Sequence, residues 1–138
     1  MSPTPPAGAI AFAEVATTSQ ARDDSGPTLV IGTSDAARAT IARLVLGASA
    51  AAGRVMVAVF QGQQTTGGYS VRVTGIERRG DQLLVRATFT SPGPGAIVTQ
   101  VLTSPAHVVS IAAADAAGLH EAVLFDETGA EQARTTIT

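Results

Sequence analysis

The chain has 138 residues, a formal net charge of -2 and no cysteine. A single domain of this length buries enough surface to fold without disulfide bonds or structural metals, and the missing thiols exclude thiolate zinc sites and cysteine catalysis. Its basic residues are all arginine and are scattered from Arg22 to Arg134, so the basic patch that nucleic acid requires is absent, and no apolar window is long enough to span a membrane.

The first eight residues are rich in proline, and we expect them to be disordered or extended ahead of one domain that covers residues 9–138. They do not show a basic segment followed by an apolar core, so we do not expect them to be an intact signal peptide. A first strand is expected near Ile10 and Phe12, and a second over 28–32, bounded by Pro27 and Gly32. The polar loop between these strands suggests that they form a hairpin.

One helix is expected at about residues 34–46. Ser34 or Thr33 would cap its free amides, Asp35 lies in its first turn, and Gly47 would end it. The apolar residues of this segment follow helical spacing and form one stripe: Ala37, Ile41, Leu44, Val45 and Ala48.

The next segment, residues 54–60, is apolar without alternation, which predicts a central strand that is covered on both faces. The strongest hairpin follows over 69–90, where apolar and polar residues alternate on both sides of a turn at Gly80, and Gly75 shifts the phase as a bulge would. Further short strands are expected over 96–102 and 106–114, and a final hairpin turns at Thr128 and Gly129. The pattern predicts a mainly β, α+β domain: an antiparallel sheet, half-barrel or sandwich of about seven to eight short strands with one helix.

Groups that could perform catalysis are few. Without cysteine or lysine, the base for a nucleophile would have to be His107, His120 or a carboxylate, and both histidines are interpreted as ordinary surface or edge residues. Asp23 and Asp24 are interpreted as a solvated turn, and no carboxylate pair stands out for acid–base work. We therefore expect a protein that is not an enzyme, with no catalytic residue, no metal site and no cofactor.

The segment TTGGYSV, residues 65–71, joins the apolar strand to the hairpin. Its glycines allow positive φ or close backbone approach, its threonines can bond local backbone, and the ring of Tyr69 can pack while its hydroxyl reaches water. The segment is either a tight strand connection or a partner-binding loop. It does not read as a phosphate loop, because it leads into a strand and not into a helix N-terminus.

With SPGPGAIVTQVLTSP and VVSI following in order, the sequence resembles the PrcB C-terminal domain family, most closely over residues 55–111. The resemblance implies a non-catalytic domain that stabilises or assembles a bacterial extracytoplasmic protease or envelope complex, in the periplasm, in the cell envelope or outside the cell. A protein partner, such as a secreted protease, would then bind the rigid loops. The partner-binding residues that we infer are Gln63, Gln64, Thr65, Thr66, Gly67, Gly68, Tyr69, Pro92, Gly93, Pro94, Gly95, Thr103 and Pro105.

Three alternatives remain open at this point. TTGGY is similar in concept to the inhibitory loop of chagasin-type protease inhibitors, although Gln63 and Gln64 replace its Asn-Pro and the chain has no tryptophan. Gln63, Gln64 and Gln100 near the loops would suit a β-domain that binds a small ligand or a glycan. An apolar edge strand at 106–113 could pair between chains to make a homodimer.

Overall fold

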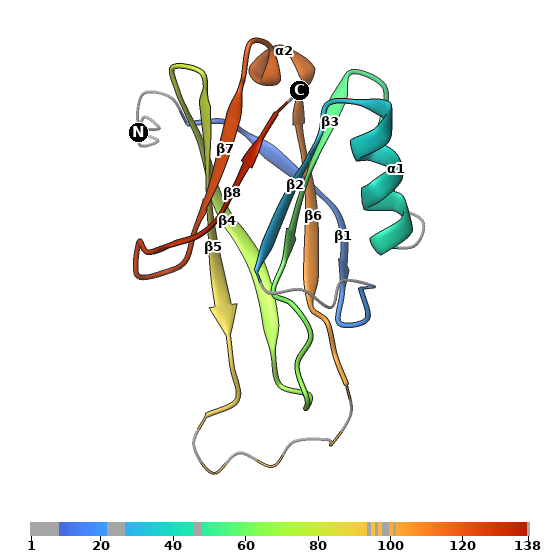
Figure 1. Ribbon diagram of the computed structural model, residues 1–138, viewed down its shortest axis with the longest axis vertical. Helices are drawn as coiled ribbons and strands as arrows, with labels where there is room; N and C mark the ends of the chain where they lie inside the picture. Colours follow the sequence, from blue (N-terminus) through green and yellow to red (C-terminus); the bar gives the residue numbers. More distant parts are fainter. Residues whose placement is uncertain are drawn as a thin grey trace, which may run out of the picture.

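The computed structural model describes residues 9–21, 27–45, 48–93, 95, 97, 100 and 102–137, which form a sandwich of two four-stranded sheets with one helix against an outer face (Figure 1). No helix of the described part is long and apolar enough to cross a membrane. The mainly β, α+β architecture agrees with the sequence prediction. The elements in chain order are β1 (Phe12–Thr18), β2 (Thr28–Gly32), α1 (Asp35–Leu44), β3 (Arg54–Phe60), β4 (Ser70–Arg79), β5 (Gln82–Thr90), β6 (Ala106–Ala112), α2 (Ala113–Ala116), β7 (Glu121–Phe125) and β8 (Glu131–Thr136).

The first sheet has the order β1-β6-β3-β2, and all its neighbours are antiparallel. Within β3, Val57 and Val59 belong to the core between the sheets, whereas Met56 and Phe60 belong to the core under α1. Because successive side chains of a strand point to opposite faces, a strand with a core on each side is apolar throughout. The prediction of a central strand covered on both faces is confirmed.

Helix α1 begins where the sequence predicts. The hydroxyl of Ser34 accepts a hydrogen bond from the Ala37 amide at 3.1 Å, which satisfies one of the free amides of the first turn. The helix ends at Leu44, slightly earlier than expected, and the expected stop at Gly47 lies outside the described residues. Ile41, the centre of the predicted stripe, is fully buried.

The second sheet has the order β4-β5-β7-β8. Its β4–β5 hairpin contains the predicted bulge, because the register shifts between Val73 and Gly75, and the predicted turn, because Gly80 has a φ of 65°. The final hairpin β7–β8 is also confirmed. Strands β5 and β7 pair in parallel, since the chain passes through β6 and α2 of the other side before it returns.

Three expectations are wrong. The first two strands form no hairpin: β1 pairs with β6 and β2 with β3, so they lie at opposite edges of one sheet. The described positions of the segment 96–102 belong to no strand. The segment 106–113 contains β6, a central strand that is already paired on both sides, so it offers no free edge for a homodimer.

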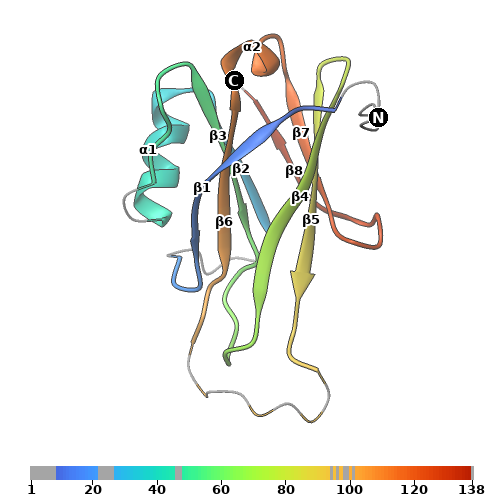
Figure 2. The same cartoon turned by 180° about the vertical axis from the view of Figure 1, so that it is seen from behind.

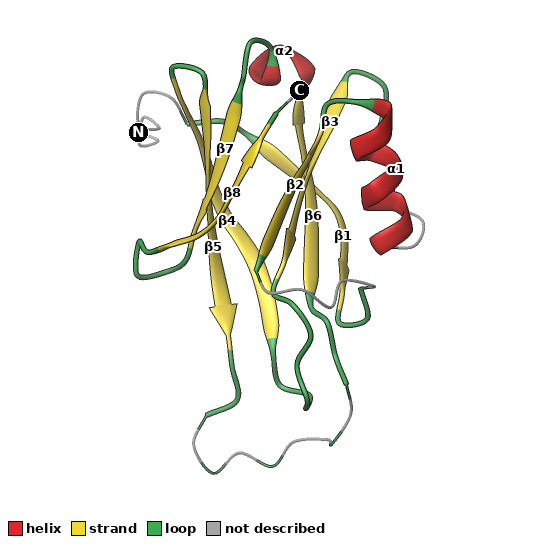
Figure 3. Ribbon diagram, viewed as in Figure 1, coloured by secondary structure: helices red, strands yellow, loops and turns green. Residues whose placement is uncertain are grey.

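The chain crosses between the sheets at its beginning. Ala9 pairs with Glu77 of β4, and the Ile10 amide donates to the Ile76 carbonyl at 2.9 Å before the chain enters β1 of the other sheet (Figure 2). At the end of the sandwich away from α2, the loop that follows β3 and the described beginning of the loop that follows β5 extend beyond the strands (Figure 3). These two loops carry the sequence motifs.

Candidate functional site

The two motif loops are joined by backbone pairing. The Gln64 amide donates to the Thr103 carbonyl at 2.7 Å, and the Thr103 amide donates back to the Gln64 carbonyl at 2.9 Å. The Thr103 hydroxyl donates to the Thr66 carbonyl at 2.9 Å, and the Gln61 amide donates to the Pro105 carbonyl at 2.9 Å. The segment before β6 therefore holds the loop after β3 in place, although the two are far apart in sequence.

Tyr69 lies where the first motif loop enters β4. The residue is half-buried and lines a pocket of about 450 Å³ together with Pro105 and the end of β1. Gly68 has a φ of 87°, a conformation that residues with a side chain rarely adopt, whereas Gly67 is not among the glycines with positive φ. Part of the motif is thus required by the backbone of this connection.

The structure describes the Pro/Gly segment at Pro92, Gly93 and Gly95. Gly93 and Gly95 are exposed, Pro92 is half-buried, and Pro94 lies outside the described residues. On the same loop, Ile97 is fully exposed and Leu102 is 58% exposed, and these are the large apolar side chains that the described part of the chain leaves open to solvent.

Nine of the predicted binding residues divide into two groups, whereas Gly67, Gly68 and Pro92 belong to neither group and Pro94 lies outside the described residues. The structure brings one group together through the paired loops and the pocket beside them: Gln64, Thr66, Tyr69, Thr103 and Pro105. A second group is exposed nearby without such contacts among the described residues: Gln63, Thr65, Gly93 and Gly95.

His107 is not the surface or edge residue that the sequence suggested. It is 5% exposed, because it follows the same alternation as Val109 and Ile111 and its ring enters the sandwich. Its Nδ1 accepts the Val73 amide at 2.9 Å, so the ring proton lies on Nε2, which faces Glu14 Oε1 at 3.1 Å. These residues line a groove of about 630 Å³ between β1, β4 and β6.

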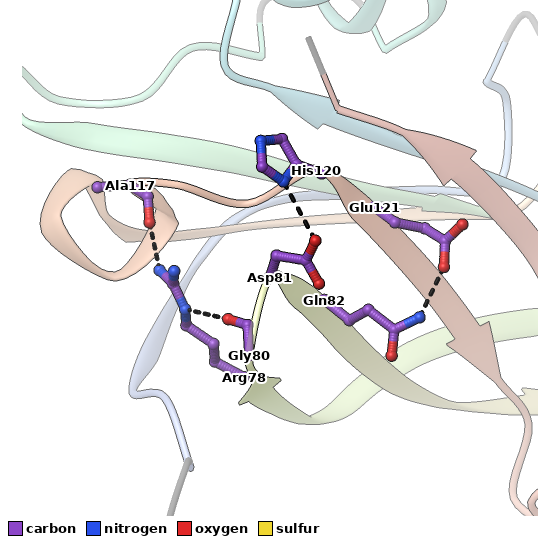
Figure 4. Close-up of polar contacts among 7 residues, drawn as sticks. All are labelled: Arg78, Gly80, Asp81, Gln82, Ala117, His120 and Glu121. Carbon is purple, nitrogen blue, oxygen red and sulfur yellow. Dashed lines mark hydrogen bonds and ion pairs between the residues drawn. The ribbon is translucent and has the colours of Figure 1, made fainter.

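His120 agrees with its interpretation as a surface residue. Its Nδ1 lies 3.1 Å from Asp81 Oδ2, and both side chains are mostly exposed (Figure 4). In the same region the Arg78 guanidinium donates to the carbonyls of Gly80 and Ala117, which anchors α2 beside the β4–β5 turn. The partner of His120 is thus Asp81 and not Glu121, its neighbour in sequence, whose side chain binds Gln82.

A third pocket, of about 270 Å³, contains a residue that the sequence did not identify as a candidate site residue. Gln61 lines it together with Gln64, Phe89 and Glu127, near the turn between β7 and β8. The Gln61 carbonyl oxygen Oε1 is buried and has no hydrogen-bond partner in the part of the chain that the structure describes. Sequence alone offered one weak signal, a glutamine directly after an apolar strand, and nothing to say that it would be buried.

Two carboxylates near this turn, Asp126 and Glu131, have lowered pKa values. Hydrogen bonds, chiefly that from the Thr128 hydroxyl, lower the pKa of Asp126 below its ordinary value. On β8, the hydrogen bond from Arg134 lowers the pKa of Glu131, and the same contact raises the pKa of Arg134. Asp126 and Glu131 therefore keep their negative charges to a lower pH than ordinary carboxylates do.

The comparisons with known proteins agree with the sequence resemblance. The family model described as PrcB C-terminal matches residues 55–112, which run from β3 to the end of β6 and include every motif position around Tyr69 and Thr103. Neither the curated proteins nor the solved structures gave a match to this chain. The resemblance to the PrcB C-terminal family is thereby confirmed over residues 55–112, which make up less than half of the chain.

Proposed function

We propose that this protein is a non-catalytic binding domain that stabilises or assembles an extracytoplasmic protease complex, and that it binds its partner through the two paired motif loops. The observation that carries the proposal is the position of Ile97 and Leu102. Both are exposed and apolar, and both lie on the loop that Thr103 ties to the TTGGYS segment. Exposed apolar side chains that lie close together are typical of protein-binding surfaces.

The family match supports the association with a protease, because it covers both motif loops. The location outside the cytoplasm is part of the proposal and comes from the family. The absence of catalytic chemistry is also proposed, and it is supported by the environment of the histidines. His107 uses both ring nitrogens in contacts within the fold, and His120 is an exposed residue paired with Asp81.

The test is affinity capture of a protease from the secreted and envelope fractions of the native host, with measurement of how fast the captured protease loses activity. A double variant, Ile97→Ser with Leu102→Ser, should retain more than about tenfold less protease than the parent if these side chains are central to the interface. The control is Ile97→Val with Leu102→Ile, which keeps the surface apolar and should retain the protease.

Three outcomes would count against the proposal. Equal retention by the polar and the conservative variants would show that the loop is a structural connection only. If the folded parent captured no protease, the proposed association with a protease would be wrong. A captured protease that is inhibited, rather than protected from inactivation, would favour the chagasin-like alternative.

A second candidate function is binding of a glycan or small polar ligand in the groove between β1 and β4. It is favoured by the hydroxyl groups that line this groove with Glu14 and Arg72, which are suited to hydrogen bonding with sugars. Gln63 and Gln100, which suggested this function by sequence, are exposed and do not line it. A thermal-shift screen in which no sugar raises the melting temperature would remove this candidate.

A further inference from the structure

The side chain of Gln61 contains a buried hydrogen-bond acceptor without a donor among the described residues. Gln61 is 8% exposed, and its Nε2 donates to the Thr90 carbonyl at 3.2 Å, while its Oε1 has no hydrogen-bond partner among the described residues. Buried polar atoms of native proteins nearly always form a hydrogen bond, because an unpaired one loses its interaction with water and gains nothing in return. Gln61 also lines the pocket of about 270 Å³, and either an ordered water or a donor bound in that pocket would satisfy this oxygen.

Two of the other polar residues that line this pocket, Asp126 and Glu127, are carboxylates, whereas Gln64 and Gln132 have amide side chains that can both donate and accept. Asp126 is occupied by its own turn: Oδ1 accepts from Thr128 and Ala130, and Oδ2 accepts from Gln132. Glu127 is less engaged, because its Oε2 receives only the Phe89 amide, at 3.3 Å, among the described contacts. None of the described residues that line the pocket is basic.

We propose that this pocket receives an arginine side chain of the protein partner. A guanidinium group carries several N–H donors in one plane and no acceptor, so one group can satisfy both the Gln61 oxygen and the Glu127 carboxylate. The Phe89 ring and Pro27 also line the pocket and supply apolar surface for a planar cation and its aliphatic stem.

The pocket is continuous with the proposed partner surface, and the inference rests on that proposed function. Gln64 lines the pocket, and its backbone pairs with Thr103 in the motif-loop connection. A partner that covers the motif loops would thus pass over the mouth of the pocket. The charge of the occupant follows from the lining, because carboxylates with no basic neighbour among the lining residues attract a cation.

The experiment uses the full chain and two small probes. N-acetylarginine amide and N-acetylcitrulline amide have nearly the same shape, but only the first is charged. We expect the arginine probe to shift the NMR signals of the Gln61 side-chain amide and the Gln64 backbone amide in a saturable way, and to do so less at high salt. The citrulline probe should leave them unchanged.

Two variants test whether the NMR response to the arginine probe comes from this pocket. Glu127→Gln should weaken binding of the arginine probe by about fivefold to tenfold, as expected for loss of one charge-assisted hydrogen bond. The control is Glu77→Gln on β4, which makes the same change in net charge and should leave binding of the probe unchanged. Gln61→Met removes the unpaired oxygen and should abolish the shift at the Gln64 amide while the rest of the spectrum stays native.

Equal responses to both probes, or none to either, would overturn the inference, as would a Glu127→Gln variant that binds as well as Glu77→Gln. Persistence of the Gln64 shift in Gln61→Met would show that the unpaired oxygen has no part in the site. Because this assay contains no protease, its failure is separate from failure of the loop-variant capture experiment.

Discussion

His107 joins the two sheets through its imidazole ring. Val73 lies on β4, at the edge of the second sheet, and its amide points away from β5 toward the other sheet. Because Val73 is only 2% exposed, water cannot replace a lost acceptor there. The imidazole is thus a polar contact that a buried edge strand needs.

We expect His107→Phe to lower the free energy of unfolding by about 1–3 kcal/mol, since it leaves the buried Val73 amide without an acceptor. Urea unfolding followed by circular dichroism measures this change. The control is His120→Phe, whose exposed ring should change stability by no more than about 0.5 kcal/mol. Similar losses in the two variants would contradict a specific role of the His107 contact.

The β7–β8 turn is stabilised by a charged side chain. Asp126 accepts hydrogen bonds from the amides of Thr128 and Ala130 and from the Thr128 hydroxyl, and its pKa is lowered below 3.8 as a result. A carboxyl group whose pKa is lower in the folded protein contributes stability above its unfolded pKa. That contribution is lost as the pH falls through the folded pKa.

Asp126→Asn should therefore lower the melting temperature near neutral pH, and the difference from the parent should shrink as the pH falls below the ordinary aspartate range, since both proteins are then uncharged at this position. Thermal melts of both proteins across the acid range measure the effect. In the companion variant Thr128→Val, the NMR-measured pKa of Asp126 should rise toward its ordinary value. An unchanged pKa would exclude the Thr128 hydroxyl as the main cause.

The local sequence pattern was sufficient to predict those elements whose partners are adjacent in sequence. The β4–β5 hairpin followed from alternation on both sides of Gly80, and α1 followed from its stripe around Ile41 and its cap at Ser34. The same reasoning failed for the first strands, because β1 pairs with β6 across most of the chain. The order of strands in a sheet depends on long-range packing, which no short window contains.

The site was predictable to a smaller extent. The motif identified Thr66 and Thr103 as members of one family pattern, but not that a hydrogen bond joins them. His107 was misread because an alternating strand shows which residues share a face, and not whether a second sheet covers that face. Gln61 was missed because an unpaired oxygen is a property of the surroundings and not of the residue.

At the scale of the whole molecule, the protein has two cores that share one sheet. The larger core fills the space between the sheets, and the smaller one lies under α1. A helix of ten residues is unstable by itself in water, so α1 depends on the smaller core. The larger core is enclosed by strands of both sheets, which hold each other in place.

Because α1 depends on the smaller core alone, we expect local opening of α1 to be separate from unfolding of the whole domain. Ile41→Ala should create a cavity under α1, and Leu83→Ala one between the sheets, each at a cost of about 2–5 kcal/mol, since both side chains are fully buried. Hydrogen exchange measured by mass spectrometry should then separate the variants. Ile41→Ala should speed exchange in α1 while β5 and β7 stay protected, whereas Leu83→Ala should speed exchange throughout, because opening the shared core unfolds the domain. Faster exchange of β5 and β7 in Ile41→Ala, to the same degree as in α1, would show instead that the two cores unfold as one unit.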